Sequence, residues 1–388
     1  MNEWKKVKLK ELIKEVNERN KGEKVKRVLS VTNSRGFMNQ EEYFEGTVHS
    51  TDISNYKIVR KNQFAYNPSR VNVGSIDILN NYEEGALSPM YVIFEVDKEK
   101  LLPEYFKYYF QTNRFLENVK NNTQGSVRNS LSFKALADFD YLLPPIEEQE
   151  KIVKILKNID NIIEKLIYEI SLIDYQNKNY IKKLLDNDKI NEIECVKLKE
   201  ISSIITKGTT PKKFTNDGIR FVKIEALNGE NIDNEKCSFI TQDEHIGYLK
   251  RSMLEENDIL FAIAGATIGK CAIVKKENLP ANTNQALSII RLNNKQDSKY
   301  IIKILESSLM KKYISMNLTV GAQPNLNLEQ IGNFKIPKLN KEKRDKFLKV
   351  INLYENKIML LNNKKEEYMT LEEFLIQQLL TGKVKVNV

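Results

Sequence analysis

Two long heptad patterns, one in each half of the chain, constrain the fold more than any other feature of the sequence. In both, apolar residues recur every seventh position with a companion row four places on, which is the spacing of a coiled-coil seam. Each pattern predicts a helix of about 40 residues, or roughly 60 Å at 1.5 Å per residue. The seam positions are Ile152, Leu156, Ile159, Ile163, Leu166 and Ile173 in the first half, and Phe347, Ile351, Tyr354, Ile358, Leu361 and Tyr368 in the second.

The two patterns belong to an internal repeat. The seam row that starts at Ile152 returns at Phe347, 195 positions later. Near the start of the chain, residues 7–12 (VKLKEL) return at 196–201 (VKLKEI), 189 positions later. The change of offset means that the first stretch differs slightly in length between the copies. We conclude that the chain is two copies of one unit, each ending in a long helix.

The surroundings of the heptads predict where the helices begin and how they pair. Pro144-Pro145 and Pro337 stand just before the two patterns, where proline is tolerated at or before a first helical turn. Asn177 and Glu372 interrupt the two seams at equivalent positions, as residues that fix register often do. Antiparallel packing within one chain would bury both seams, and we expect it; a homodimer through the same seams is the alternative.

Short β-rich segments fill the rest of the chain. Residues 91–96, 219–224 and 259–263 combine β-branched and aromatic side chains as strands do, whereas 102–116 and 298–313 are spaced as short amphipathic helices. We therefore predict an α+β protein, in which two mixed α/β domains alternate with two long helices that pair as an antiparallel coiled coil, with an internal pseudo-two-fold repeat. The predicted boundaries are 1–144 and 190–337 for the globular domains, 145–186 and 338–380 for the helices, and 381–388 for a C-terminal tail.

Targeting and redox features point to the cytoplasm. Residues 1–16 alternate charged and apolar side chains and lack the core of a signal peptide. No run approaches the roughly 18 apolar residues of a membrane span. The three cysteines, Cys195, Cys237 and Cys271, are widely spaced, so that neither a disulfide framework nor a zinc knuckle is expected. We expect a soluble, cytoplasmic protein without membrane contact.

Catalytic signatures are weak. His49 and His245 are the only histidines, and neither stands in a metal-binding or triad pattern, so that each is best explained as a surface or packing residue. Residues 265–271 (GATIGKC) resemble a phosphate loop, but only three residues separate the glycines and Cys271 replaces the Ser or Thr that would hold magnesium. The residues that follow, 272–274, indicate a strand rather than a helix. We therefore predict no catalytic residue, no metal site and no nucleotide site.

Charge and loop composition favour a polyanionic partner. Lys+Arg 61 against Asp+Glu 52 gives a net charge of +9, which suits nucleic acid or an acidic membrane surface. Basic residues, and amides able to contact base edges, gather in the predicted turns. Each one alone is explained as solvated surface, but as a set they support nucleic-acid contact. The candidates are Arg35, Arg70, Gln124, Arg128, Asn129, Lys207, Lys212, Lys213, Arg220, Lys270, Gln285 and Gln323.

A series of motifs resembles one known family over essentially the whole chain. Residues 142–152 (LLPPIEEQEKI) resemble the PPxxEQ entrance to the conserved helix of type I restriction–modification specificity subunits, and 125–131 (GSVRNSL) are similar to the segment before it. The second copy departs from this entrance, because Arg344 occupies the place of Gln149. Segments that resemble the family's target-recognition domains are 64–70 (FAYNPSR), 88–91 (SPMY), 208–211 (GTTP), 264–270 (AGATIGK) and 282–286 (NTNQA).

The resemblance implies a non-catalytic specificity (S) subunit that binds double-stranded DNA. Domains 1–144 and 190–337 would be target-recognition domains, each reading half of a split sequence. The paired helices would set the spacing and dock two DNA adenine methyltransferase subunits, with Pro144, Pro145, Glu148 and Gln149 at the partner junction. Restriction and translocase subunits would be further partners. S-adenosylmethionine, magnesium and ATP would bind to those partners, and no cofactor to this chain.

Three alternatives stay open at this point. One is a nuclease or methyltransferase fused to recognition domains, which would need a metal cluster or cofactor loop. Another is a stand-alone coiled-coil scaffold whose domains bind protein; steep salt dependence of DNA binding would argue against it. The third is a recognition module of a methyltransferase that has no restriction partner.

Overall fold

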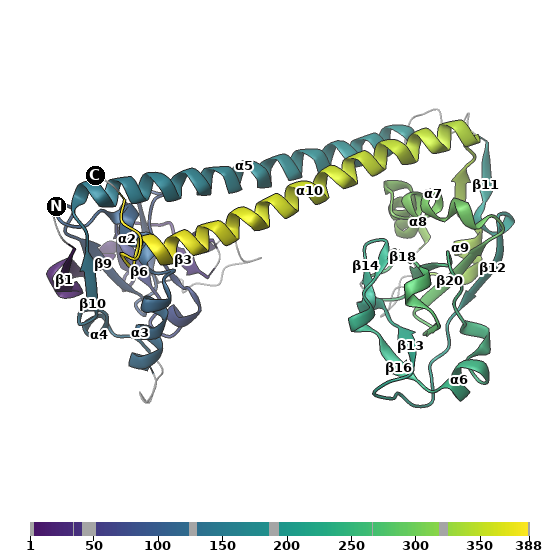
Figure 1. Ribbon diagram of the computed structural model, residues 1–388, viewed down its shortest axis with the longest axis horizontal. Coiled ribbons are helices and arrows are strands. Elements are labelled where there is room, and N and C mark those ends of the chain that lie inside the picture. Colours follow the sequence, from purple (N-terminus) through teal and green to yellow (C-terminus); the bar gives the residue numbers. More distant parts are fainter. Residues whose placement is uncertain are drawn as a thin grey trace. The chain divides into compact units, whose positions relative to one another are not determined.

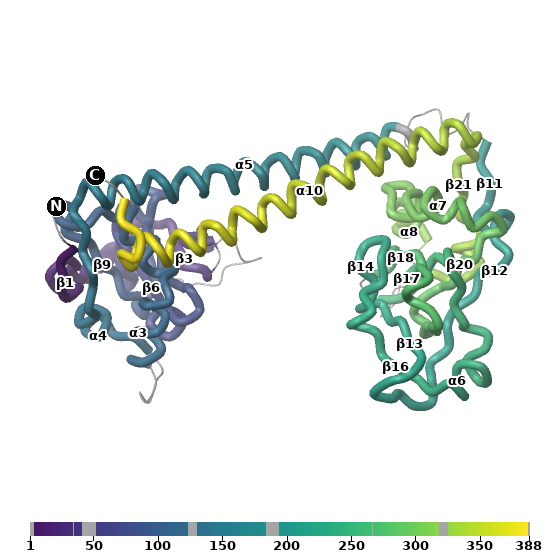
Figure 2. The backbone as a smooth tube through the Cα atoms, viewed as in Figure 1, coloured from purple at the N-terminus to yellow at the C-terminus, as the bar shows by residue number. Residues whose placement is uncertain are grey.

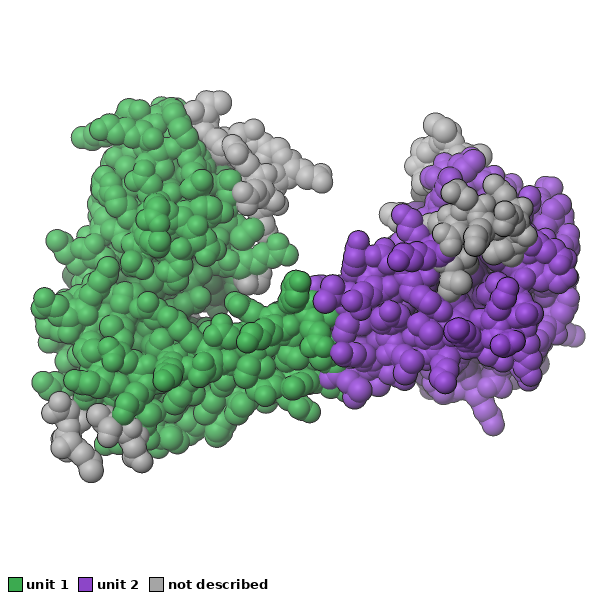
Figure 3. All heavy atoms as spheres, turned by 90° about the horizontal axis from the view of Figure 1, so that it is seen from above, with its two compact units in different colours: residues 1–169, 361–388 green, residues 170–360 purple. Residues whose placement is uncertain are grey.

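The computed structural model describes residues 4–33, 35–40, 52–123, 130–185, 194–265, 267–317 and 325–386. The chain forms two compact units: unit 1 holds residues 1–169 and 361–388, and unit 2 holds residues 170–360 (Figure 3). Two long helices, α5 (Ile146–Leu185) and α10 (Lys341–Leu379), each contribute one half to each unit (Figure 1). Both ends of the chain belong to unit 1 (Figure 2).

Unit 1 is built around a four-stranded antiparallel sheet of order β2-β9-β6-β7. Three further strand pairs, β1-β10, β3-β4 and β5-β8, surround it. The strands are β1 (Lys5–Lys8), β2 (Ile13–Val16), β3 (Leu29–Thr32), β4 (Gly36–Asn39), β5 (Lys57–Arg60), β6 (Phe64–Tyr66), β7 (Ile76–Ile78), β8 (Glu84–Leu87), β9 (Val92–Val96) and β10 (Asp140–Leu143). The short helices are α2 (Pro103–Tyr109), α3 (Asn113–Thr123) and α4 (Phe133–Ala137).

Unit 2 contains a four-stranded antiparallel sheet of order β12-β20-β17-β18. A three-stranded sheet, β16-β13-β19, and the pairs β11-β21 and β14-β15 complete its strands. They are β11 (Cys195–Lys197), β12 (Ser202–Lys207), β13 (Ile219–Val222), β14 (Leu227–Asn228), β15 (Asn231–Ile232), β16 (Ser238–Ile240), β17 (Ile259–Ala262), β18 (Cys271–Ile273), β19 (Ala281–Thr283), β20 (Leu287–Leu292) and β21 (Lys335–Pro337). The short helices are α6 (Gln242–Ile246), α7 (Ser298–Leu305), α8 (Ser308–Asn317) and α9 (Leu328–Asn333).

The first and last strands before each long helix pair in the same way in the two units. Val7 of β1 lies opposite Tyr141 of β10, and Val196 of β11 lies opposite Ile336 of β21. The buried leucine that follows the first strand donates its backbone N–H to the chain just before the last strand in both cases, over 3.0 Å for Leu9 and 2.9 Å for Leu198. Residues 7–12 and 196–201 thus owe their common sequence to a common structural place.

An aromatic core fills unit 1 and includes both long helices. The rings of Phe64 and Phe94 stack with centroids 5.2 Å apart, on the central strands β6 and β9. Leu156 of α5 and Ile376 of α10 are fully buried in the same cluster. Burial of large apolar side chains is the main stabilising contribution to such a unit. The N-terminal half of α5 and the C-terminal half of α10 are therefore part of the unit 1 core.

The core of unit 2 takes in the other halves of the two helices. Phe347 and Ile351 of α10 are fully buried among residues of the central sheet and α7. Tyr180 of α5 stacks on Phe347 with ring centroids 6.2 Å apart. Asn340 accepts the backbone N–H of Lys343 at 2.9 Å, and this side-chain cap explains why α10 begins there.

The predicted helices at 102–116 and 298–313 are each broken into two, which corrects the sequence prediction. A hydroxyl residue stands at each break: the Thr112 hydroxyl donates to the Tyr109 carbonyl at 2.7 Å, and the Ser307 hydroxyl donates to the Ile304 carbonyl at 2.6 Å. Thr112 also accepts the backbone N–H of Phe115. Such side-chain bonds to the backbone compete with helix continuation and begin a new helix instead. Among the described residues, no helix is long and apolar enough to cross a membrane.

Candidate nucleic-acid interface

In unit 1, two of the basic candidates lie on adjoining turns. Arg35 is exposed in the turn between β3 and β4, and Arg70 is exposed in the turn between β6 and β7. The Ser75 hydroxyl donates to the Val31 carbonyl at 2.7 Å, which ties the second turn to β3. Gly74 has φ +93°, and a Cβ there would lie 3.3 Å from the Asn33 carbonyl oxygen. This close approach of two backbones favours glycine.

A groove beside Arg35 contains an acid that the sequence did not single out. Arg35, Asp77, Lys107 and Phe110 are among the residues that line it. Burial raises the pKa of Asp77, although the positive charge of Lys107, 3.8 Å away, opposes the rise. The half-buried carboxyl group of Asp77 and the exposed Arg35 give this groove both an acceptor and a donor.

In unit 2, the structure brings Lys212 and Gln285 together through the loop after β12. The Thr210 hydroxyl donates to Oε1 of Gln285 at 2.7 Å. The backbone N–H of Lys212 donates to the Glu244 carboxylate of α6 at 3.0 Å. These bonds join loop 208–213, α6 and turn 284–285 into one surface, on which Thr210, Lys212 and Gln285 are exposed.

Two residues of this surface were missed by the sequence analysis. Nη2 of Arg251 donates to the Thr209 hydroxyl at 3.1 Å, and the Lys212 ammonium lies 5.2 Å from the centroid of the exposed Tyr248 ring. The available signal was the run 248–251 (YLKR), in which an aromatic residue precedes two cations. Aromatic and basic residues together are typical of nucleic-acid surfaces.

The other candidates have different surroundings. Lys207 at the end of β12 and Lys213 are exposed. Arg220 is half-buried on β13, between β16 and β19. The half-buried ammonium of Lys270 lies 3.5 Å from the Ile224 carbonyl oxygen. Gln124, Arg128, Asn129 and Gln323 lie outside the described residues.

Leu131 and Leu326 are described residues that follow the candidates Gln124, Arg128, Asn129 and Gln323 in the chain, and they have the same place in the two units. The backbone N–H of Leu131 donates to the Pro68 carbonyl, in the turn between β6 and β7, at 3.0 Å. In unit 2, the N–H of Leu326 donates to the Ile263 carbonyl, between β17 and β18, at 2.9 Å. Both turns carry candidate cations, Arg70 in one and Lys270 in the other.

The segment that resembles a phosphate loop joins two antiparallel strands. Gly265 and Gly269, with φ +82° and +91°, lie between β17 and β18. The strand predicted after Lys270 is confirmed as β18, whereas a phosphate loop would lead into a helix. His245 is buried with its Nδ1 2.5 Å from Oδ1 of Asn282, which confirms the packing role expected for it; His49 lies outside the described residues. In the described ranges, no group of three His, Cys, Asp or Glu residues is placed to hold a metal ion.

At the start of α5, Glu148 and Gln149 are buried inside unit 1 rather than exposed. Trp4 donates its indole N–H to Glu148 at 2.8 Å. Gln149 accepts the backbone N–H of Leu102 and donates to the carbonyls of Lys100 and Pro144, each at 2.9 Å. Pro144 is buried as well, and Pro145 half-buried. The two polar side chains expected at a partner junction are therefore engaged within their own unit.

Unit 2 fastens the start of α10 by different chemistry. Arg344, which takes the place of Gln149 in the sequence, forms an ion pair of 2.8 Å with Asp297, the residue just before α7. Both side chains are about three-quarters buried, at 23% and 24% exposed. Gln149 thus connects α5 to the segment just before α2, and Arg344 connects α10 to the segment just before α7.

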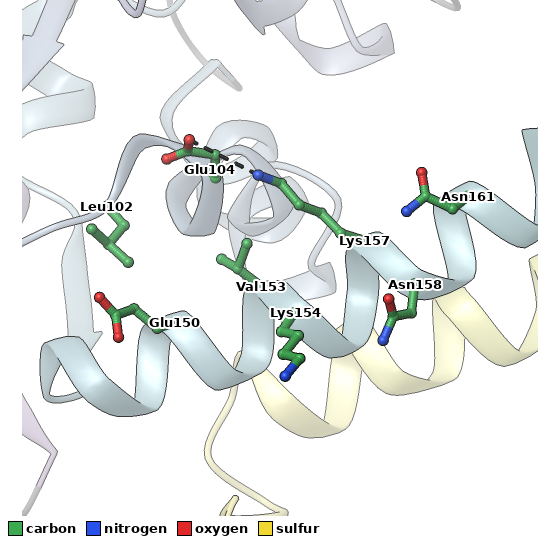
Figure 4. A pocket seen from close by; sticks show the side chains of 8 residues that line it. All are labelled: Leu102, Glu104, Glu150, Val153, Lys154, Lys157, Asn158 and Asn161. Atoms are coloured by element: carbon green, nitrogen blue, oxygen red, sulfur yellow. Dashed lines mark ion pairs between the residues drawn. The ribbon is translucent and has the colours of Figure 1, made fainter.

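The exposed side of α5 forms a groove against α2 in unit 1. Leu102, Glu104, Glu150 and Lys154 line it together with Lys157, Asn158 and Asn161 (Figure 4). Glu104 and Lys157 face each other across it at 3.9 Å. The groove is mixed in charge and open to solvent. The partner junction predicted at Pro144, Pro145, Glu148 and Gln149 stays a prediction.

Comparisons with known proteins agree with this architecture. A model of the "Type I restriction modification DNA specificity domain" matches residues 1–172 and 190–368. The MjaVIII type I restriction enzyme specificity subunit of Methanocaldococcus jannaschii is 27% identical over 325 residues, which are 79% of this chain and 76% of that protein. The EcoBI specificity subunit of Escherichia coli is 26% identical over 277 residues, 63% of this chain and 56% of its own.

Solved structures share the fold. A chain from a structural study of complex assembly and conformational transition of the type I R-M system superposes with a TM-score of 0.60 at 13% identity, covering 99% of both chains. The HsdS subunit from Thermoanaerobacter tengcongensis gives a TM-score of 0.50 at 14% identity, covering 99% of this chain and 98% of its own.

Two sheet-bearing units, each with exposed cations on its turns, have features that are typical of nucleic-acid-binding proteins. The chain belongs to the type I restriction–modification DNA specificity family. It is a specificity subunit: it recognises the DNA target and scaffolds the complex, and it is not itself the enzyme.

Proposed function

We propose that each unit reads one half of a split DNA target, and that the two long helices hold the readers apart. The observation that carries the proposal is the repeated sheet: both units contain four antiparallel strands in equivalent order, with a candidate cation on the same turn. A unit with its own sheet, core and polar turns has what it needs to read DNA independently. An internal pseudo-two-fold repeat would then present two readers to one duplex.

The helices are proposed to pair along their length as an antiparallel coiled coil. In support, Leu156 near the start of α5 shares a core with Ile376 near the end of α10, while Tyr180 near the end of α5 stacks on Phe347 near the start of α10. The seam positions are buried or half-buried throughout. The half-buried ones are Ile163, Tyr354, Ile358, Leu361 and Tyr368.

The partners are proposed to be two DNA adenine methyltransferase subunits, with restriction and translocase subunits joining them. Exposed large apolar side chains on the long helices support docking. Unit 1 exposes Ile167 to 53% and Phe374 to 57%, and unit 2 exposes Tyr175 to 63% and Leu353 to 62%. Where such residues form a contiguous patch, they are typical of an interaction surface. S-adenosylmethionine, magnesium and ATP would bind to these partners.

An exchange of one domain tests the division of labour. Residues 190–337 are replaced by the corresponding domain of a family member with a different target, and the variant is co-expressed with the methyltransferase. Sequencing of methylated DNA should show one half-site changed and the other retained, because the reader of the second half-site is untouched. A target that changed at both half-sites would show that the units read DNA jointly.

The purified chain alone provides the control. Incubated with target DNA, magnesium and S-adenosylmethionine, it should neither cleave nor methylate the DNA. Methylation should appear only when the methyltransferase subunit is added. Methyl transfer by the chain alone would contradict the proposed division between recognition and catalysis.

A further inference from the structure

We propose that Arg251 and Gln285 of unit 2 form a fixed pair of hydrogen-bond donors, in which Arg251 reads a guanine and Gln285 reads an adjoining acceptor. The inference rests on the proposed function, in which unit 2 reads one half-site. It adds which residues read bases and what those bases must offer.

The loop after β12 is pinned against the turn after β19. Gly208 approaches this turn so closely that a Cβ would lie 2.1 Å from the Thr283 carbonyl oxygen and 2.2 Å from that of Asn284. The backbone N–H of Thr209 donates to the Thr283 carbonyl at 3.0 Å. Only glycine permits this approach, and it brings Thr209 and Thr210 directly beside Gln285.

Each threonine then holds one reader. The Thr210 hydroxyl donates to Oε1 of Gln285 at 2.7 Å, and the Thr209 hydroxyl accepts from Nη2 of Arg251 at 3.1 Å. Both Arg251 and Gln285 are exposed. The Gln285 oxygen accepts this bond, and its NH2 group stays available as a donor. Arg251 keeps the rest of its guanidinium fork, which is a donor only.

A buried polar network fixes the backbone on both sides of the pair. Nδ2 of Asn282, on β19, donates to the Leu249 carbonyl at 2.9 Å and lies 3.3 Å from the Ser252 hydroxyl. Asn282 is fully buried, and its Oδ1 lies 2.5 Å from Nδ1 of His245. One side chain, three positions before Gln285, therefore fixes the segment that carries Arg251. We regard Asn282 as a positioning residue.

The surroundings suit a DNA backbone. Lys213 and Lys250 are exposed next to the pair, and the Lys212 ammonium lies over the Tyr248 ring. The Glu244 carboxylate accepts the Lys212 backbone N–H, so that the nearby acid serves the loop itself. Cations of this kind contact phosphates and fix the position of the readers, while the readers contact base edges.

The guanidinium group of Arg251 can only donate hydrogen bonds, and this property selects the base that Arg251 can read. Guanine presents two acceptors, N7 and O6, in the major groove, and arginine contacts both at once. Glutamine reads adenine by using its oxygen and its nitrogen together. The Thr210 hydroxyl occupies one of the two lone pairs of the Gln285 oxygen and holds the amide in place. We expect Gln285 to donate its NH2 group to an acceptor of the neighbouring base pair. The half-site of unit 2 should therefore contain a G·C pair that Arg251 reads.

The test uses the full chain co-expressed with its methyltransferase subunit, with the methylated-site consensus as readout. Arg251→Ala should lower the discrimination in favour of a G·C pair at one position by roughly 5- to 150-fold. Arg251→Lys should lower it as well, because lysine keeps the charge but not the planar fork of the guanidinium. Gln285→Ala should relax a neighbouring position. The matched control is Lys276→Ala, which removes an exposed cation of unit 2 outside this surface and should leave the consensus unchanged.

A base analogue tests the contact directly. Replacing the guanine at the relaxed position by 7-deazaguanine removes N7, and should weaken DNA binding by the wild-type complex at least about 5-fold. The same analogue should cause no further loss in the Arg251→Ala complex, which has no side chain that could contact N7. Thr209→Val should relax the same G·C pair, since it releases Arg251 without changing its charge.

The outcomes separate this inference from the proposed function. If exchange of residues 190–337 changes one half-site but Arg251→Lys and Gln285→Ala retain the original consensus, the donor pair is wrong and the division of labour stands. Relaxation of an A·T pair by the Arg251 variants would also overturn the pair. If Arg251→Ala abolishes all methylation, the sites methylated by the Arg251→Lys complex decide whether the G·C pair is relaxed or retained. If the domain exchange changes neither half-site, the proposed function itself fails.

Discussion

Single buried polar side chains connect parts of each unit that are far apart in the sequence. Gln149 at the start of α5 satisfies one backbone N–H and two carbonyls of the neighbouring loops. Arg344 has the corresponding place in unit 2, where it pairs with Asp297. Buried polar groups are costly unless they are bonded, and each of these residues therefore fixes the geometry of a helix start.

Gln149→Ala should destabilise unit 1 by about 2–4 kcal/mol, because it removes three hydrogen bonds to the backbone, one of them to the buried Pro144 carbonyl. Trp4, the single tryptophan, donates to the adjacent Glu148 and reports on this junction by its fluorescence. Urea unfolding followed at Trp4 measures the change. The matched control is Glu150→Ala, an exposed neighbour whose removal should change stability by less than about 0.5 kcal/mol. Equal unfolding of the two variants would show that Gln149 is dispensable.

At the scale of elements, polar groups interrupt the seam of the long helices in both units. In unit 1, the Tyr108 hydroxyl of α2 donates to Asp160 of α5, and Asp160 interacts with Glu372 of α10. In unit 2, Lys303 of α7 forms ion pairs with Glu355 of α10 and with Glu230. Asp160 and Glu355 are equivalent in the repeat, 195 positions apart. The equivalent carboxylates beside the two seams thus pair with a hydroxyl in unit 1 and with an ammonium in unit 2.

Glu372 makes unit 1 sensitive to pH. Burial, with the hydrogen bond and the charge of Asp160, raises the pKa of Glu372 from 4.5 to about 8. A carboxyl with a higher pKa in the folded chain contributes stability that is complete below pH 4.5 and is lost as the pH rises through about 8. Glu372→Gln stays neutral, and should be more stable than the wild type at pH 9 by roughly 1–2 kcal/mol, allowing for partial solvent screening.

Thermal melting at pH 5 and pH 9 measures this difference. At pH 5 the two chains should differ much less than at pH 9, because the wild-type carboxyl is then neutral in the folded chain and only its ionisation in the unfolded chain remains. Glu373→Gln, at the exposed neighbouring position, controls for the loss of a surface charge and should show no such pH dependence. A Glu372→Gln variant less stable than the wild type at pH 9 would contradict the expected protonation.

At the scale of the whole molecule, the duplication is the main feature. Each unit combines one globular stretch with half of each long helix, so that the helices belong to both cores. In the proposed function their length sets the distance between two readers. Equal lengthening of both helices should therefore change the unread gap in the DNA and leave the half-sites unchanged.

Insertion of one heptad beside Leu166 and another beside Leu361 keeps the seam in phase. Seven residues add about 10.5 Å of helix, or roughly three base pairs at about 3.4 Å each. The methylated-site consensus should show the same half-sites with a gap about three base pairs longer. The consensus is preferred to affinity as the readout, because angular mismatch around the duplex weakens binding. An active double insertion with the original gap would show that the helices are not the ruler.

The sequence by itself determined the duplication, the two long helices and the family, because these depend on patterns that repeat along the chain. Heptad spacing reports which face of a helix is apolar whatever that face packs against. Short-range signals were less complete: the helices at 102–116 and 298–313 break at Thr112 and Ser307, whose hydroxyl bonds do not alter the apolar spacing. Boundaries of this kind are decided by single side-chain bonds to the backbone.

Only the tertiary structure decided which polar residues act together. Gln149 has the same appearance in the sequence as an exposed glutamine, yet it is fully buried, whereas Gln285 is exposed and held by Thr210. Arg251 joins Gln285 because loop 208–213 packs against the turn after β19, more than 70 positions away in the chain. Such contacts depend on how loops close in space, and the linear order of residue types does not encode that closure in any local pattern.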